Sequence, residues 1–220
     1  MKKTFFKLFL ILFFLCYCQV LFLGNVSPKS VTFVIDDELG RDNVSFTSDA
    51  PIELIVGRTV KIKGKVTIDD SLDLKRLPIN ASYEVDLASI DTGIPLRNEH
   101  MRDNFLETKK FPKAIFTLSM LLLNSDSKLS DGKPVNFTAQ GSFTVHGVTV
   151  KKNIPVKVIY FKESDFTHSK FKHGDVIKIQ SSFNVPLAEH KIKRPEIIFQ
   201  KLADTVIVSV DAYGNLPVKK

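Results

Sequence analysis

The sequence predicts an all-β protein, with a single antiparallel β-barrel of about eight strands and one short helix inserted in the middle of the chain. Many segments alternate apolar and polar residues with a period of two, which is typical of strands that turn one face to water. Open sheet edges favour aggregation, so this many strands indicate a sandwich or a closed barrel, and long consecutive strands favour the barrel. The chain has 220 residues, 44% hydrophobic and 25% charged, which suits one globular domain.

The first 24 residues have the composition of a secretory signal. Two lysines precede an apolar run from Phe5 to Leu23, matching the charged and apolar regions of such a signal. The run is also long enough to cross a bilayer at ~1.5 Å per residue, so an uncleaved anchor stays open. We therefore expect a signal peptide or N-terminal anchor over 1–24, one barrel domain over 25–220, and a periplasmic or secreted product.

Both cysteines, Cys16 and Cys18, lie inside this apolar run. The domain that follows has no cysteine, and therefore no disulfide, thiol nucleophile or cysteine-based metal site. Acylation of either cysteine, as in a bacterial lipoprotein, is the minor alternative, because Leu15 and Tyr17 stand where that processing prefers a small residue.

The positive charge of the chain is not clustered. The formal net charge is +7, from 31 Lys and Arg against 24 Asp and Glu, and the excess is spread along the sequence. Nucleic-acid binding needs a concentrated basic stripe, so no nucleic-acid partner is expected. Weak contact with an anionic membrane surface and formation of a homodimer both stay open.

The strand segments follow one another as a meander. In the clearest of them, Thr59–Ile68, apolar residues or glycine alternate with lysine and threonine. His146 and Gly147 separate two further segments and fit a two-residue hairpin turn. The expected strands are Ser30–Ile35, Asn43–Ser48, Thr59–Ile68, Ile79–Leu87, Ala114–Leu122, Val135–Val145, Val148–Phe161, Val176–Val185 and Thr205–Ala212.

One segment, Arg97–Thr108, fits a short helix. Met101 and Phe105 share a face at the i,i+4 spacing, and Pro95 lies just ahead of the start. The helix therefore interrupts the meander near its middle.

Alternation also selects the residues that face the barrel interior. A barrel of about eight strands holds either packed side chains or one small apolar ligand, so a filled core and a ligand tunnel are both open. The residues expected on the inner face are Val60, Ile62, Val66, Val85, Leu87, Phe116, Leu118, Met120, Phe137, Phe143, Val156, Val158, Ile179, Phe183, Val206 and Val208.

The sequence carries no recognisable catalytic or metal-binding motif. Its five histidines lack the HExxH spacing of zinc proteases, and there is no GxSxG elbow or glycine-rich phosphate loop. His168 and His173 could chelate a metal weakly, but Lys170, Lys172 and Gly174 beside them indicate an exposed hairpin loop. No metal site and no catalytic residue are therefore expected.

The stretch from Ser89 to Leu118 contains several short motifs in order. They are a Ser-Ile-Asp-Thr-Gly turn at 89–93, a helix with Arg97, His100, Met101 and Arg102, and a strand with Phe111, Pro112, Ile115 and Phe116. Further matching segments are Phe46–Gly64, Gly141–Thr149, His190–Pro195 and Asp204–Val210. Together they resemble the signature of the YceI-like family, lipocalin-like polyisoprenoid-binding proteins that many bacteria export.

The resemblance implies a lipocalin-like barrel that holds a long isoprenoid lipid, such as a polyprenyl lipid or quinone, in an apolar tunnel. Buried CH₂-type groups contribute ~0.8 kcal/mol each, so apolar walls can retain such a chain without a cofactor or a reactive residue. Asp91, Arg97, His100 and Arg102 are then candidates for contact with a polar or phosphorylated head group, since guanidinium groups suit phosphate oxygens.

Three alternatives to this interpretation stay open. The polar residues could be structural, with Asp91 capping the helix or pairing with an arginine and Gly93 supplying the turn. The protein could instead be an enzyme acting on an isoprenoid or quinone, with His100 in its polar machinery. It could also be a surface adhesion or structural protein with a filled barrel.

Overall fold

The computed structural model describes residues 29–123, 126–194 and 200–217, so the predicted signal segment 1–24 lies outside the described residues. No helix in the described part of the chain is both long and apolar enough to cross a membrane. The elements are β1 (Ser30–Ile35), β2 (Asn43–Ala50), β3 (Glu53–Thr59), β4 (Ile62–Asp69), β5 (Asn80–Asp86), η2 (Leu87–Ser89), α2 (Pro95–His100), η3 (Met101–Phe105), β6 (Lys113–Leu123), β7 (Pro134–Val145), β8 (Val148–Phe161), α3 (Asp165–His168), β9 (Val176–Pro186), η4 (Leu187–His190) and β10 (Thr205–Asn215).

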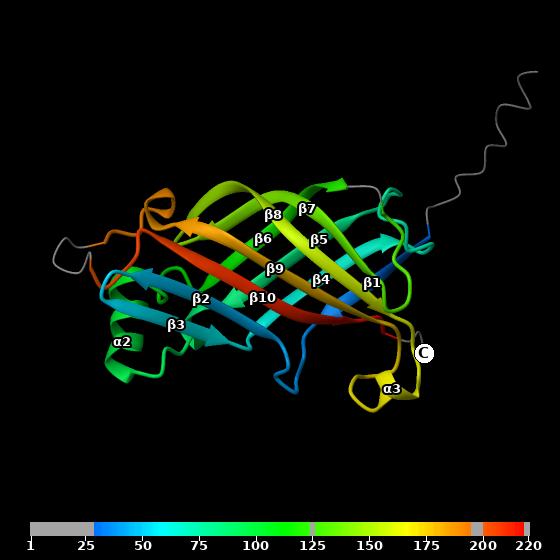
Figure 1. The fold of residues 1–220 in the computed structure, drawn as a ribbon, viewed down its shortest axis with the longest axis horizontal. Coiled ribbons are helices and arrows are strands. Elements are labelled where there is room, and N and C mark those ends of the chain that lie inside the picture. Colours follow the sequence, from blue (N-terminus) through cyan, green and yellow to red (C-terminus); the bar gives the residue numbers. More distant parts are fainter. Residues whose placement is uncertain (1–28, 124–125, 195–199, 218–220) are drawn as a thin grey trace, which may run out of the picture.

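The described strands form one antiparallel sheet in the order β1-β4-β5-β6-β7-β8-β9-β10-β2-β3 (Figure 1). β1 also pairs with β10, through Val34 and Asn215, so β1 and β4 to β10 close into a ring of eight strands. The hairpin β2–β3 pairs with a different part of β10, where Phe46 lies opposite Val208. The prediction of an all-β antiparallel barrel of about eight strands with a short mid-chain helix is confirmed.

The predicted strands omit β3 and join its last residue, Thr59, to β4. Leu54 and Val56 on β3 expose 62% and 46% of their surface, so apolar residues occupy the outer face and the alternation is lost. The predicted continuous strand Thr59–Ile68 is wrong at its start. The Thr59 hydroxyl accepts a hydrogen bond from the Lys61 N–H at 3.0 Å, and the chain turns there before β4 begins.

The helical segment lies two to three residues nearer the N-terminus than predicted. Pro95 is the first residue of α2, a position that suits proline because the N–H it lacks would be unpaired there. After His100 the helix continues as a π-helical turn, η3, and stops at Phe105 instead of Thr108. Figure 1 shows α2 at one end of the barrel and the unpredicted helix α3 at the other.

Two clusters of buried apolar side chains support the barrel. One includes Leu87 and Met101 and joins the strand ends to the α2–η3 segment. The other contains Phe33 and Ile35, which are completely buried beside the closure of β1 on β10.

Candidate functional site

A cavity of about 690 Å³ lies inside the barrel. Side chains from both apolar clusters line the cavity, and the α2–η3 segment lines one end of it. Packed protein interiors leave few voids larger than a water molecule, whereas ligand sites typically enclose ~300–1,000 Å³. The barrel is therefore hollow over part of its length and large enough for a ligand.

All but two of the residues predicted to face inward lie on the cavity wall. They are Ile62, Val66, Val85, Leu87, Phe116, Leu118, Phe137, Phe143, Val156, Val158, Ile179, Phe183, Val206 and Val208. The two exceptions are Val60 and Met120, and in each case the local path of the backbone explains the error.

Val60 lies in the link between β3 and β4 and not within a strand. The Ile62 N–H donates a hydrogen bond to the Val60 carbonyl at 3.1 Å, which makes the link a tight turn. Alternation cannot be extended through such a turn. The prediction that Val60 shares the inward face of Ile62 is therefore wrong.

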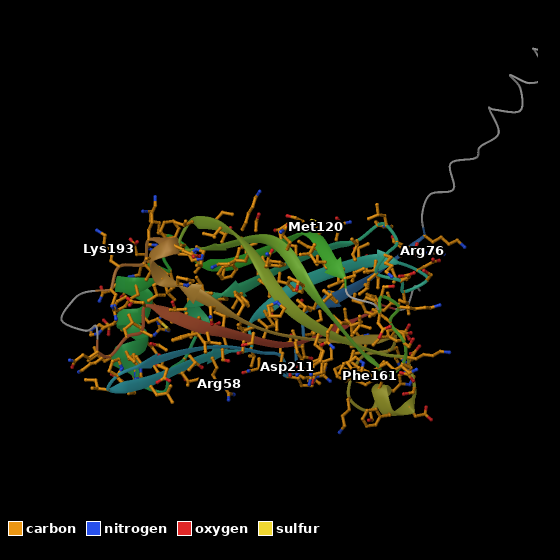
Figure 2. The ribbon with its side chains drawn as sticks, turned by 45° about the horizontal axis from the view of Figure 1, so that its top comes forward. Arg58, Arg76, Met120, Phe161, Lys193 and Asp211 are labelled. Carbon is orange, nitrogen blue, oxygen red and sulfur yellow. The ribbon has the colours of Figure 1, made fainter. Side chains whose placement is uncertain are left out.

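Met120 follows an irregularity in β6. Leu118 lies opposite Gly141, whereas Met120 lies opposite Gln140, so Ser119 is an extra residue in the strand. A bulge of this kind reverses the alternation beyond it. Met120 accordingly lies on the outside of the barrel with 47% of its surface exposed, and Leu121 lines the cavity in its place (Figure 2). The prediction that Met120 lines the interior is wrong.

Several wall residues were absent from the predicted set. Met101 and Phe105 reach the cavity from the helical segment, where period-two alternation does not apply. Tyr83 also lines the cavity, and its alternation with charged Glu84 in β5 could have revealed it. Burial raises the pKa of the Tyr83 phenol far above its ordinary value, so this wall residue stays a neutral hydrogen-bonding group.

Asp91 organises the turn before α2. Its Oδ1 accepts hydrogen bonds from the Gly93 N–H at 2.8 Å and from the Asn98 Nδ2 at 2.6 Å, and these bonds lower the pKa of the Asp91 carboxyl. The backbone of Asp91 also exchanges two hydrogen bonds with that of Arg58 on β3. Asp91 is not on the cavity wall, so its contacts are those of a structural residue.

Arg97 ties α2 to β3 at one end of the cavity. Its Nη1 donates to Glu53 Oε1 at 2.8 Å. Its Nε and Nη2 donate to the hydroxyl and the carbonyl of Thr92 at 3.0 and 2.8 Å. All three side chains contribute to the cavity wall, so this polar group borders an otherwise largely apolar space.

Of the two remaining polar candidates, only His100 lines the cavity. His100, at the end of α2, is exposed and still contributes to the cavity wall. Arg102 is not on the wall, and its Nη1 donates to the Ala88 carbonyl at 3.1 Å. The structure therefore brings Arg97 and His100 to the cavity and leaves Asp91 and Arg102 outside it. We call the end of the cavity bordered by Glu53, Thr92, Arg97 and His100 the mouth.

Solved structures with the same fold come from several bacteria. The chain is 18% identical to Burkholderia cenocepacia BcnA, with a TM-score of 0.62, covering 81% of this chain and 99% of BcnA. It is 19% identical to a polyisoprenoid binding domain from Saccharophagus degradans, with a TM-score of 0.61 and coverage of 86% and 100%. It is 16% identical to a Campylobacter jejuni YceI protein, with a TM-score of 0.57 and coverage of 74% and 85%.

These identities establish a shared fold and no more. No curated protein is similar enough in sequence to count as a match. The family model of the YceI-like domain, however, matches residues 33–213, which is nearly the whole described barrel. This match agrees with the motifs between Ser89 and Leu118 and with the hollow eight-stranded ring. The chain belongs to the YceI-like family.

Proposed function

We propose that the protein is an exported, non-catalytic carrier that holds one isoprenoid lipid in its barrel cavity. The observation that carries this proposal is the cavity of about 690 Å³ with its largely apolar wall. The Saccharophagus degradans neighbour, described as a polyisoprenoid binding domain, supports the same class of ligand. The predicted signal in residues 1–24 supports a periplasmic or secreted location.

The cavity is large enough for an apolar ligand to bind without a charged anchor. At about 30 Å³ per water-sized group, it accommodates roughly 20 non-hydrogen atoms, or about four isoprene units. Burying that many carbon groups at ~0.8 kcal/mol each contributes up to ~16 kcal/mol before the costs of association. Micromolar affinity requires ~8 kcal/mol, so the apolar wall alone supplies enough free energy, and any longer chain extends through the mouth.

The polar end of the ligand would lie at the mouth. His100 is exposed there. The Arg97 guanidinium lies at the same end of the cavity, where its hydrogen bonds to Glu53 and Thr92 fix its position. A quinone ring or a phosphate would meet hydrogen-bond donors at this point. The involvement of Asp91 and Arg102 is not part of the proposal, because neither contributes to the wall.

The bulge in β6 provides a matched pair of variants for the test. Leu118→Trp adds volume on the cavity wall, whereas Met120→Trp makes the same kind of addition two residues away on the outer surface. Organic extracts of the purified proteins are analysed by mass spectrometry. We expect a prenyl lipid with the wild-type and Met120→Trp proteins and its loss from the Leu118→Trp protein.

The melting temperatures separate a hollow barrel from a filled one. Overpacking a close-packed core costs ~1–3 kcal/mol, whereas a hollow cavity absorbs the added indole with a small shift. A Leu118→Trp protein that is strongly destabilised, together with a wild-type protein that never carries lipid, would overturn the proposal. Loss of lipid from both variants would also contradict it, because Met120 does not line the cavity.

A further inference from the structure

Three side chains with metal-binding atoms converge in the loop between β8 and β9, at the opposite end of the barrel from α2 (Figure 1). The Nε2 atom of His168 lies 2.6 Å from Glu163 Oε1 and 3.3 Å from His173 Nδ1. His173 Nδ1 lies 3.5 Å from the same Glu163 oxygen. The three atoms thus form a compact triangle on the protein surface.

The triangle has nearly the dimensions of one face of a tetrahedral metal site. Zinc binds histidine nitrogen and carboxylate oxygen at ~2.0–2.2 Å, and tetrahedral angles then separate neighbouring ligand atoms by roughly 3.3–3.5 Å. The two contacts of His173 already have this length. Only the hydrogen-bonded pair of Glu163 and His168 must open, by about 0.8 Å on the same geometry. A cation at the centre of the triangle would accept one lone pair from each of the three atoms, because neutral imidazole nitrogen and carboxylate oxygen are both metal ligands.

The backbone around the triangle is firmly held. The Gly174 N–H donates to Glu163 Oε1 at 2.9 Å, and Gly174 has a φ of +109°, where an added Cβ would lie 1.8 Å from the Leu216 carbonyl oxygen. The Asn215 side chain at the end of β10 donates to the His173 carbonyl at 3.0 Å. The ligand-bearing loop is therefore fastened to the barrel, and a preorganised loop loses little entropy when it binds a metal.

Helix α3 places the middle ligand. The Ser164 hydroxyl accepts a hydrogen bond from the Thr167 N–H, and the Thr167 side chain completes a capping box. The cap starts the single helical turn that ends at His168. Glu163 immediately before the cap and His168 at the end of the turn thereby come together, although neither position belongs to a known metal-binding spacing.

We propose that Glu163, His168 and His173 bind one divalent transition-metal ion, with zinc as the reference ion. Two imidazoles and one carboxylate suit Zn²⁺ or Cu²⁺, whereas Mg²⁺ and Ca²⁺ prefer sets of oxygen ligands. The His173 side chain is 77% exposed, so the fourth position faces solvent. This proposal departs from the expectation that the two histidines form only a solvated loop, and it is independent of the lipid proposal.

Calorimetric titration of the untagged protein, expressed from the full sequence, with zinc chloride tests this site. We expect one saturable zinc ion per chain and no competition from excess Mg²⁺. Glu163→Gln and His173→Ala should each weaken binding by ~10–100-fold or more, since loss of a direct ligand costs at least as much as loss of a supporting contact. Glu99→Gln, which removes an exposed carboxylate from α2 at the other end of the barrel and outside the cavity wall, is the matched control and should bind as wild type.

Circular dichroism establishes that each variant keeps its β-sheet before it is titrated. Absence of saturable zinc binding by the folded wild-type protein would overturn the proposal. Equal affinities across the wild-type, Glu163→Gln and His173→Ala proteins would also overturn it, since zinc would then be bound by scattered surface groups.

Discussion

Asp42 should make the stability of this barrel fall as the pH rises. The residue lies just before β2 and is only 1% exposed. Its Oδ1 accepts a hydrogen bond from the Tyr213 N–H at 2.8 Å, but within the described residues its Oδ2 has no partner. The neighbouring Arg41 is paired with Asp37. Burial, with a smaller contribution from the Asp37 charge, raises the pKa of Asp42 from 3.8 to about 6.

The size of the effect follows from this difference in pKa. Between pH 3.8 and about 6, the folded protein holds a proton on Asp42 that the unfolded chain has released. The contribution of Asp42 to stability is therefore fully present below pH 3.8 and is lost as the pH rises through 6. At ~1.4 kcal/mol for each pKa unit, the loss amounts to ~3 kcal/mol.

The variant Asp42→Asn keeps the shape of the side chain and removes its titration. We expect the free energy of unfolding of the variant, minus that of wild type, to rise by ~3 kcal/mol between pH 3.5 and pH 7.5 and then to level off. Urea denaturation at a series of pH values measures both curves. Taking the difference removes the opposite contributions of carboxyl groups whose pKa values are lowered, such as Asp69 and Asp73.

Asp49→Asn is the control, because it removes an exposed carboxylate from β2 and so reports the effect of losing one negative charge. A difference curve for Asp42→Asn that is flat, or that falls as the pH rises, would refute the assignment of a buried carboxyl group with a raised pKa. A constant offset between the two proteins would reflect the amide's altered hydrogen bonding and would leave the slope unaffected.

Three further predictions concern the core, a turn and the N-terminus. Phe33→Ala should cost ~3–5 kcal/mol in urea denaturation because Phe33 is fully buried, and a loss below 1 kcal/mol would contradict its place in the core. Gly147→Ala should lower the melting temperature more than Gly132→Ala: both glycines have φ near +70°, but only at Gly147 does an added Cβ meet a ring, at 2.4 Å. Mass analysis of the exported protein should show loss of residues 1–24, whereas an intact N-terminus would favour an anchor and an acylated cysteine a lipoprotein.

The sequence was sufficient for most of the barrel because a strand with one wet and one apolar face must alternate. β1 and β8 have the predicted bounds, and the other predicted strands differ mainly at their ends. The hairpin at His146 and Gly147 was also predicted, and both residues have the positive φ that a two-residue turn of this kind requires. These features depend on residues that are close together in the chain.

The sequence also determined most of the cavity wall, but not the points where the strand pattern breaks. The extra residue Ser119 does not interrupt the strand-like sequence of β6. Only the pairing with β7 reveals that the alternation reverses there and that Met120 faces outward. The strand β3 carries apolar residues on its outer face and is recognisable only once it pairs with β2. Register and bulges are set by the partner strand, whose influence is not visible in a local pattern.

Which polar residues come together was decided only by the tertiary structure. Arg97 meets Glu53, 44 positions earlier in the chain, because the backbone bridge between Asp91 and Arg58 holds the turn before α2 beside β3. Glu163 meets His168 and His173 because a short helical turn folds the loop back on itself. Such contacts depend on the path of the whole backbone, whereas alternation depends on a residue and its nearest neighbours. The sequence alone therefore determined the barrel and its apolar interior, and the closed fold determined the mouth and the surface cluster.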